Sequence, residues 1–279
     1  MLRAILILLL PLGAAACTAP REPPQETGTA SPLARAALAE WQAWGGIVVV
    51  GWPEARPPDT AATPERLARL MEYWMAVPGG SGVARRLSGL RSAIAAASAG
   101  QFGAERQDGG GEGPAIQAVV AAPGPEDMSI YAFPAWSAAF VSAIARRAGL
   151  SEGDLPAADR HARYIDALLA RAIAAPGGAP FLPYAPEDRG PRPGDLLCAD
   201  RSATPLSHWS MRLAEVGRPR PMHCDIVVRT SPGAIEAVGG NVQDLVVLRR
   251  LPADAAGRVL PAPSGQPSFV LVLAAQDSG

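Results

Sequence analysis

The stretch that decides the fold is Pro134-Ala135-Trp136-Ser137-Ala138-Ala139-Phe140-Val141-Ser142. It predicts a helix that ends at Gly149, because proline is tolerated at a helix start and glycine favours the left-handed cap that closes a helix. Apolar residues at helical spacing give this helix one face for a core: Ala139, Phe140, Ala143, Ile144 and Ala148. Ser137 falls in the first turn, at the positive end of the helix dipole. A nucleophile is often placed there, because free backbone N–H groups stabilise nearby negative charge.

Length and charge limit the classes of function. The chain has 279 residues, enough for one large domain or two small ones, and its formal net charge is −1. All 25 basic residues are arginines, and 26 acidic residues balance them. The charge therefore gives no electrostatic reason to expect a nucleic-acid partner.

The first 33 residues are predicted to be targeting and linker sequence. A basic start at Arg3 precedes an apolar run that is too short to span a membrane, so residues 1–16 are interpreted as a signal peptide. The stretch Gly13-Ala14-Ala15-Ala16-Cys17 resembles a bacterial lipobox, which implies that Cys17 is lipidated and attaches the protein to a membrane. Thr18 after the cysteine suggests the outer membrane, facing the periplasm. The alternative is an ordinary signal peptide cleaved near Ala16. Residues 17–33 are predicted to be a flexible tether.

The remaining chain is predicted to be α+β. Residues 34–114 are interpreted as a helical N-terminal region packed on the main domain, with a short strand or buried run at 47–50, and residues 115–279 as that main domain. Helices are expected over 34–44, 63–77, 83–97 and 157–174. Residues 177–193 are expected to form a long loop and 100–114 a mobile one. Short β-branched runs separated by turn residues predict an antiparallel meander, with strands at 196–199, 225–229, 234–238, 245–248 and 269–273 after a first strand at 115–121.

Four motifs occur in a recognisable order. Pro134-Ala135-Trp136-Ser137 is followed by Pro193-Gly194-Asp195, then by His223-Cys224-Asp225, and finally by Ile235 to Val242 with its Gly240-Asn241 pair. Together they resemble the CHAP and NlpC-type domains, which are papain-like amidohydrolases and peptidases. They also resemble an uncharacterised family of bacterial lipoproteins near this superfamily. The resemblance implies a papain-like fold over the second half of the chain.

The resemblance also implies a catalytic triad, with one departure from the family. Ser137 occupies the position of the usual catalytic cysteine, His223 that of the general base, and Asn241 that of the residue that orients the imidazole. A serine cannot form the thiolate–imidazolium pair of a cysteine enzyme, so His223 would have to take its proton during attack. Asn241 offers only a neutral dipole to the resulting imidazolium, which makes this a weaker triad. The alternative for Ser137 is a hydroxyl that caps the helix.

Other polar residues are candidates for the same cleft. Trp136, His161 and Asp225 are candidates to bind substrate, although the pattern favours a core position for His161, and Asp225 could equally be a solvated strand end. Asp225 lies two residues from His223, and a regular strand places both on one face. Cys198 and Cys224 fall on predicted strands and form either a disulfide or two buried thiols. No zinc-type spacing is present, so neither a metal nor a cofactor is expected.

Two functions are compatible with these features. The first is hydrolysis of peptide or amide bonds in peptidoglycan through Ser137, His223 and Asn241. The second is a catalytically inactive relative that binds cell-wall peptide or a protein of the cell envelope.

Overall fold

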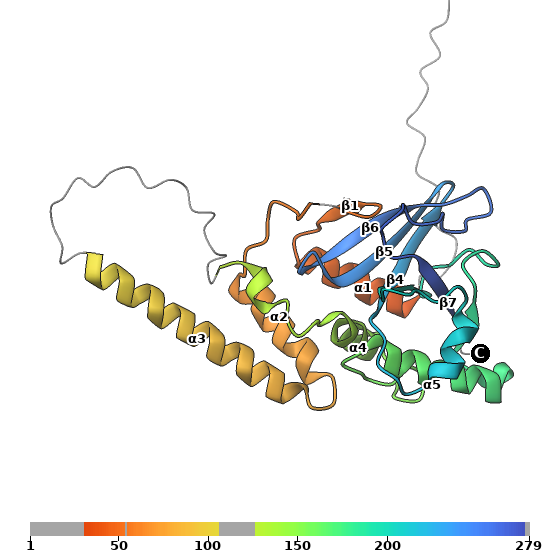
Figure 1. The fold of residues 1–279 in the computed structure, drawn as a ribbon, viewed down its shortest axis with the longest axis horizontal. Helices are drawn as coiled ribbons and strands as arrows, with labels where there is room; N and C mark the ends of the chain where they lie inside the picture. The colour runs from red at the N-terminus through yellow and green to blue at the C-terminus, as the bar shows by residue number, and fades with distance from the viewer. Residues whose placement is uncertain (1–30, 54, 106–125, 277–279) are drawn as a thin grey trace, which may run out of the picture.

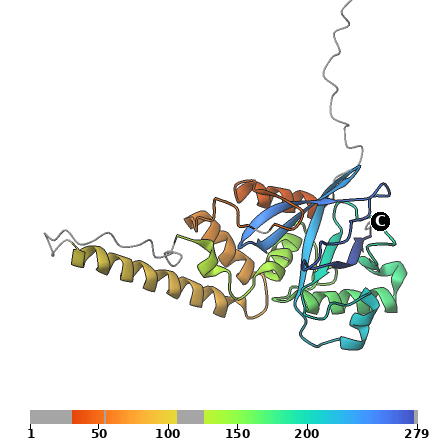
Figure 2. The same cartoon turned by 45° about the horizontal axis from the view of Figure 1, so that its top comes forward.

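A computed structural model of the chain describes residues 31–53, 55–105 and 126–276. Five α-helices are present in this part of the chain: α1 (Pro32–Ala43), α2 (Pro64–Met75), α3 (Gly80–Glu105), α4 (Ser137–Arg147) and α5 (His161–Ala174) (Figure 1). Three short 3-10 helices accompany them: η1 (Met128–Tyr131), η2 (Pro176–Gly178) and η3 (Trp209–Glu215). Helix α3 extends away from the body of the molecule in both views (Figures 1 and 2).

One mixed sheet of seven strands forms the centre of the fold. The strands are β1 (Val48–Val50), β2 (Phe181–Tyr184), β3 (Leu196–Asp200), β4 (Met222–Ser231), β5 (Ala234–Val242), β6 (Leu245–Pro252) and β7 (Phe269–Ala275). Their order across the sheet is β1-β6-β5-β4-β3-β7-β2. All neighbouring pairs are antiparallel except β1 with β6, which is parallel. The expected α+β class and the meander of β3 to β6 are therefore present.

Of the two edge strands, β2 was not expected and β1 was. The loop expected over 177–193 contains β2, where Pro183 interrupts the strand pattern; the sheet accepts it because β2 is an edge strand. The short strand or buried run expected at 47–50 is a strand, β1, and it forms the opposite edge of the same sheet. Helix α3 is longer than the expected 83–97, and α5 begins only at His161.

The two faces of the sheet are covered differently. The larger core lies on the face of β4 that carries Cys224, Ile226 and Val228, where it meets α1, α4 and α5. A smaller apolar cluster lies on the other face, around Val227 on β4 and Leu197 on β3. Because successive side chains of a strand alternate between faces, His223 and Asp225 belong with Val227 on the face away from the main core.

Several predictions concern residues outside the described part of the chain. These are the signal peptide at 1–16, lipidation of Cys17, most of the tether at 17–33, the loop at 106–114 and the strand at 115–121. Within the described ranges, no helix is both long enough and apolar enough to span a bilayer.

A glycine on β5 fixes how closely α4 approaches the sheet. A Cβ atom built on Gly240 would lie 2.5 Å from Cγ of Phe140, which is fully buried on α4. We expect Gly240→Ala to lower the free energy of unfolding by about 1–3 kcal/mol, because extra volume in a packed core forces strain. Urea unfolding measures this change.

Gly89 in α3 is the matched control, because a Cβ atom there meets nothing within 4 Å. Gly89→Ala is expected to leave stability unchanged or raise it by up to about 1 kcal/mol, since alanine favours the helix. Equal effects of the two substitutions would contradict the close approach of α4 to β5.

Candidate functional site

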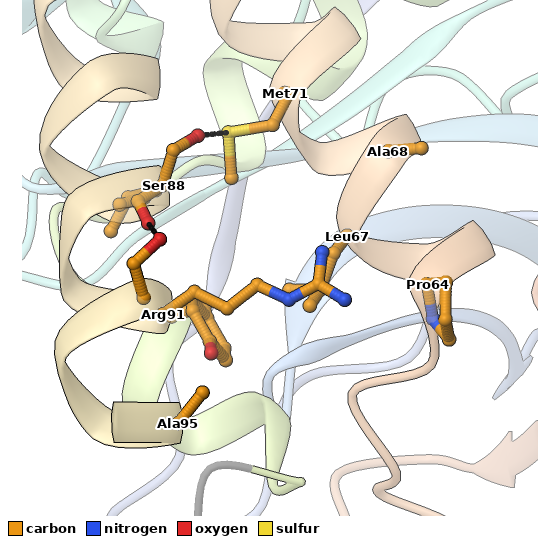
Figure 3. A pocket seen from close by; sticks show the side chains of 10 residues that line it. Pro64, Leu67, Ala68, Met71, Ser88, Arg91 and Ala95 are labelled. Carbon is orange, nitrogen blue, oxygen red and sulfur yellow. Dashed lines mark hydrogen bonds between the residues drawn. The ribbon is translucent and has the colours of Figure 1, made fainter. Parts of the chain in front are cut away.

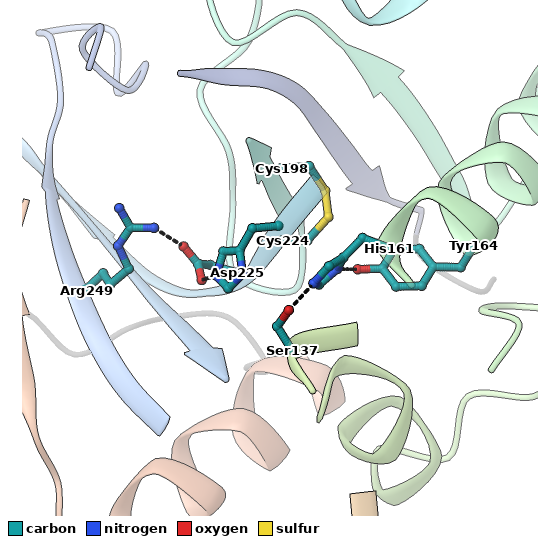
Figure 4. The surroundings of a disulfide bond; sticks show 8 residues. Ser137, His161, Tyr164, Cys198, Cys224, Asp225 and Arg249 are labelled. Atoms are coloured by element: carbon teal, nitrogen blue, oxygen red, sulfur yellow. Dashed lines mark hydrogen bonds and ion pairs between the residues drawn. A yellow bond between two sulfur atoms is a disulfide. The ribbon is translucent and has the colours of Figure 1, made fainter. Parts of the chain in front are cut away.

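Ser137 is the first residue of α4, and its hydroxyl bonds a histidine rather than capping the helix. Trp136 takes the N-cap position, and no side chain of the cap bonds the helix end. Oγ of Ser137 lies 2.6 Å from Nε2 of His161, the first residue of α5. The other ring nitrogen of His161 bonds the hydroxyl of Tyr164, one helical turn further along α5 (Figure 4). Ser137 and His161 are only 6 % and 4 % exposed.

Burial keeps this histidine neutral. Desolvation, together with the nearby His223, holds the pKa of His161 well below its ordinary value. Burial also raises the pKa of Tyr164 well above its ordinary value, so the phenol keeps its proton. If the phenol donates to Nδ1 of His161, then Nε2–H donates to Ser137. If instead Nδ1–H donates to the phenol, Nε2 accepts the proton of Ser137 and is poised as a base.

Each arrangement leaves one hydroxyl proton without an acceptor, and the first satisfies the more deeply buried hydroxyl, since Ser137 is 6 % exposed and Tyr164 fully buried. Tyr164 is fully buried, and among the described residues His161 is the hydrogen-bond partner of its hydroxyl. A phenol that only accepts from His161 leaves its own O–H without an acceptor, which is costly in a buried site. The resting state that satisfies Tyr164 therefore has His161 donating to Ser137.

A second histidine is held by a buried ion pair. Nε2 of His223 lies 2.9 Å from Oδ1 of Asp225, and Nη1 of Arg249 lies 2.7 Å from Oδ2 of the same carboxylate. Burial opposes ionisation of Asp225, but Arg249 and His223 outweigh it and keep the pKa of Asp225 below its ordinary value. An ionised carboxylate only accepts, so Nε2 of His223 carries a proton. Nδ1 of His223 is then left for another partner, and none is present within the described structure.

The two histidines meet edge to face at one end of the sheet. Their ring centroids are 5.4 Å apart. His161 sits beside Ser137 because α5 begins next to the start of α4. His223 lies on the opposite face of β4 from the helices, and this alternation explains why Ser137 bonds His161 and not His223.

A disulfide joins β3 and β4 at Cys224, the residue that follows His223. Cys198 on β3 and Cys224 on β4 face each other directly in the strand register and are bonded (Figure 4). The register also pairs Ala199 with His223. The disulfide therefore ties together the two strands that carry one wall of the site.

A polar pocket of about 170 Å³ opens beside His223. Its wall carries three basic side chains and three amides. The lining residues are Trp52, Pro53, Ala199, Arg201, His223, Asn241, Val242, Gln243, Arg249, Gln266 and Pro267. No carboxylate is among them, so the pocket suits a ligand that carries acceptors or negative charge.

The predicted triad is not assembled as the sequence suggested. Asp225, and not Asn241, is bonded to the imidazole of His223. Asn241 has a positive φ of 58°, and its amide nitrogen donates to the carbonyl of Ala132 at 3.2 Å. It lines the pocket with His223, but it does not orient that ring. Asp225 reaches the ring because it lies on the same strand face as His223, at the i, i+2 spacing.

Trp136 also differs from its predicted role. It is fully buried and stacks on Trp44 and Tyr73, with ring centroids 5.5 and 5.8 Å apart. Trp136 therefore packs in the core at the start of α4 and does not line the pocket. His161 is buried, as the core alternative expects, and is also part of the polar network.

A second hollow lies elsewhere, between α2 and α3 (Figure 3). Its volume is about 360 Å³, and it is mainly apolar, with Leu67, Met71 and Leu87 in its wall. It contains none of the predicted site residues. In the described ranges, no three His, Cys, Asp or Glu side chains are grouped to hold a metal ion.

Three site residues were not identified from the sequence. Tyr164 follows His161 at i+3, a spacing that places both on one helix face and could have indicated the contact. Arg249 and Arg201 gave no such signal, because their positions depend on how distant strands pair.

One protein-family model matches residues 117–269, which is more than half of the chain. Its description is "Uncharacterized protein conserved in bacteria (DUF2272)". No curated protein and no solved structure matches the chain.

The buried neutral His161 predicts a pH dependence of stability. In the unfolded chain a histidine takes up a proton below about pH 6.5, whereas His161 in the folded protein does not, because its pKa is lowered. The unfolded state then binds more protons, so stability falls as pH falls, by up to about 2 kcal/mol between pH 6.5 and 5. Urea unfolding of the wild-type protein and of His161→Gln at both pH values measures the difference.

His161→Gln is expected to lose less stability over this interval than the wild type, because it lacks the titrating ring. His208 and the carboxylates away from this site are common to both proteins and cancel in the comparison. An identical pH dependence in the two proteins would show that His161 titrates normally.

Proposed function

The chain belongs to the bacterial DUF2272 family, and we propose that it is a ligand-binding domain of the cell envelope that takes a peptide or amide of the cell wall into the pocket beside His223. The envelope location rests on the signal-peptide and lipobox pattern of residues 1–17, with Cys17 as the lipidated residue and the outer membrane as the anchor. The ligand class rests on the resemblance of the motifs to CHAP and NlpC-type domains.

One observation carries the binding proposal. His223 is buried, lines the pocket and has Nε2 engaged by Asp225, while its Nδ1 has no partner in the described structure. A buried polar atom without a partner costs free energy, and a ligand that bonds it recovers that cost. Asp225 and Arg249 hold the ring rigidly, so little ordering is needed when a ligand binds.

We also propose that the domain is papain-like, as its sequence motifs imply, and the position of α4 supports this. Helix α4 begins at Ser137 and packs on β4 and β5 of a largely antiparallel sheet, as a papain-like domain requires of its nucleophile helix. His223 and Asp225, which follow later in the chain, lie on β4. The hydrogen-bond pairing differs from that of the family, because Ser137 bonds His161.

Hydrolysis is the second candidate function, and the 2.6 Å contact between Ser137 and His161 favours it. In such a reaction Oγ of Ser137 attacks the amide carbon as its proton moves to Nε2 of His161. The C–N bond then breaks, the amine leaves with that proton, and water later releases the acyl group. First-turn N–H groups of α4, which have no acceptor within the helix, are available to the oxyanion.

Two features place binding ahead of hydrolysis. Ser137 is not among the residues that line the pocket. In addition, the arrangement that satisfies the buried hydroxyl of Tyr164 makes His161 a donor to Ser137, so the serine is not activated at rest. Hydrolysis would require the other tautomer of His161 and a path by which the substrate reaches Ser137.

Incubation of the mature chain with purified cell-wall material tests both candidates. We expect retention on the wall without new amine termini. His223→Gln should weaken retention by about 5- to 150-fold, the range for loss of one buried hydrogen bond of about 1–3 kcal/mol. His208→Gln is the matched control, since His208 lies outside the pocket.

Unfolding midpoints of the variants establish that each is folded. Retention that is the same in His223→Gln and in the wild type would contradict the binding proposal. New amine termini that disappear in both Ser137→Ala and His161→Gln would establish hydrolysis in its place.

A further inference from the structure

Among the described residues, Arg201 is the only arginine of the pocket wall whose charge is not paired with a carboxylate. Arg249 in the same wall is paired with Asp225 at 2.7 Å. The guanidinium of Arg201 has no hydrogen bond or ion pair to any described residue, although it lines the pocket. It is exposed, so its charge costs little in the free protein and is available to a ligand.

The carboxylates near Arg201 and the pocket are already paired elsewhere. Asp200, its neighbour in sequence, is bonded to Arg220 at 2.7 Å. Asp244, beside Gln243 of the pocket wall, is bonded to Arg56 at 2.9 Å. Neither carboxylate is therefore free to neutralise Arg201, and the pocket favours an anionic group.

His223 adds a second requirement on the ligand. In the form of His223 that carries one proton, Asp225 holds this proton on Nε2, so Nδ1 presents a lone pair and accepts a hydrogen bond. The ligand must therefore supply an N–H group near its negative charge. The pocket volume of about 170 Å³ is below the range of about 300–1,000 Å³ for drug-sized ligands, so it suits a fragment such as one small amino-acid residue.

We propose that this pocket is a subsite for the C-terminal residue of a peptide, with the terminal carboxylate bound by Arg201 and the N–H of the same residue donated to Nδ1 of His223. The inference deepens the proposed function and rests on it for the location of the ligand. A C-terminal residue carries an amide N–H and a carboxylate on one carbon, which matches Nδ1 of His223 and the guanidinium of Arg201, two of the groups in the pocket wall that have no partner among the described residues. The amide of Gln266 is a further donor in the pocket wall, whereas that of Gln243 already donates to the carbonyl of Pro53.

Calorimetric titration of the full mature chain with N-acetyl-alanyl-alanine, and with the same dipeptide as its C-terminal amide, tests the subsite. We expect the acid to bind about 10-fold or more tightly than the amide, as a charge-assisted hydrogen bond implies. Arg201→Gln should weaken binding of the acid by a similar factor and leave binding of the amide nearly unchanged. The preference for the acid should therefore disappear in this variant.

Arg218→Gln is the matched control, because Arg218 is exposed, lies outside the pocket and loses the same charge. Its acid-to-amide ratio should equal that of the wild type. A wild-type protein that binds neither dipeptide, or an Arg201→Gln variant that keeps the preference for the acid, would overturn the proposal. Equal losses in both arginine variants would also overturn it, since they would reflect net charge alone.

The test of the subsite and the test of the proposed function can give different results. Dipeptide binding that depends on Arg201, combined with no retention on wall material, would establish the subsite and reject cell-wall peptide as its occupant. Wall retention that depends on His223, combined with no preference for the acid, would reject the subsite and keep the binding function.

Discussion

The site depends on the buried carboxylate of Asp225. It is fully buried, and it remains ionised because Arg249 bonds one oxygen and His223 the other. Removing one partner of such a pair leaves an uncompensated buried charge, which typically costs about 3–5 kcal/mol. The same carboxylate fixes which nitrogen of His223 carries the proton, and so determines what the pocket offers to a ligand. Gly239 on β5 leaves room for this carboxylate, since a Cβ atom there would lie 2.0 Å from its Oδ1.

The rest of the fold brings two separate polar networks to one end of the sheet. Helices α4 and α5 start there and carry Ser137, His161 and Tyr164, while β4 and β6 supply His223, Asp225 and Arg249 from the other face. The two histidine rings are the contact between the networks. Under the proposed function, the ligand binds to the network of His223, the network of Ser137 is a buried support, and the serine at the helix start is not required as a nucleophile.

The sequence predicted the fold better than the site, for physical reasons. Periodicity and turn residues are local, so they placed α4 and the strands β3 to β7. The partners of Ser137 and His223 depend on which face of the sheet each side chain occupies and on how strands pair across the chain. Strand alternation did place Asp225 beside His223. Asn241 does not follow the alternation of side chains in a regular strand, because its backbone has a positive φ. Arg201 and Arg249 reach the pocket only through tertiary packing.

The most direct test of this account is a crystal structure of the protein in complex with N-acetyl-alanyl-alanine. We expect the N–H of the C-terminal alanine to lie within about 3.2 Å of Nδ1 of His223, the usual limit of a hydrogen bond. The carboxylate should lie against Arg201, with Ser137 still bonded to His161. A dipeptide bound with its amide carbon against Oγ of Ser137, away from His223, would contradict the account and return the serine to the role of nucleophile.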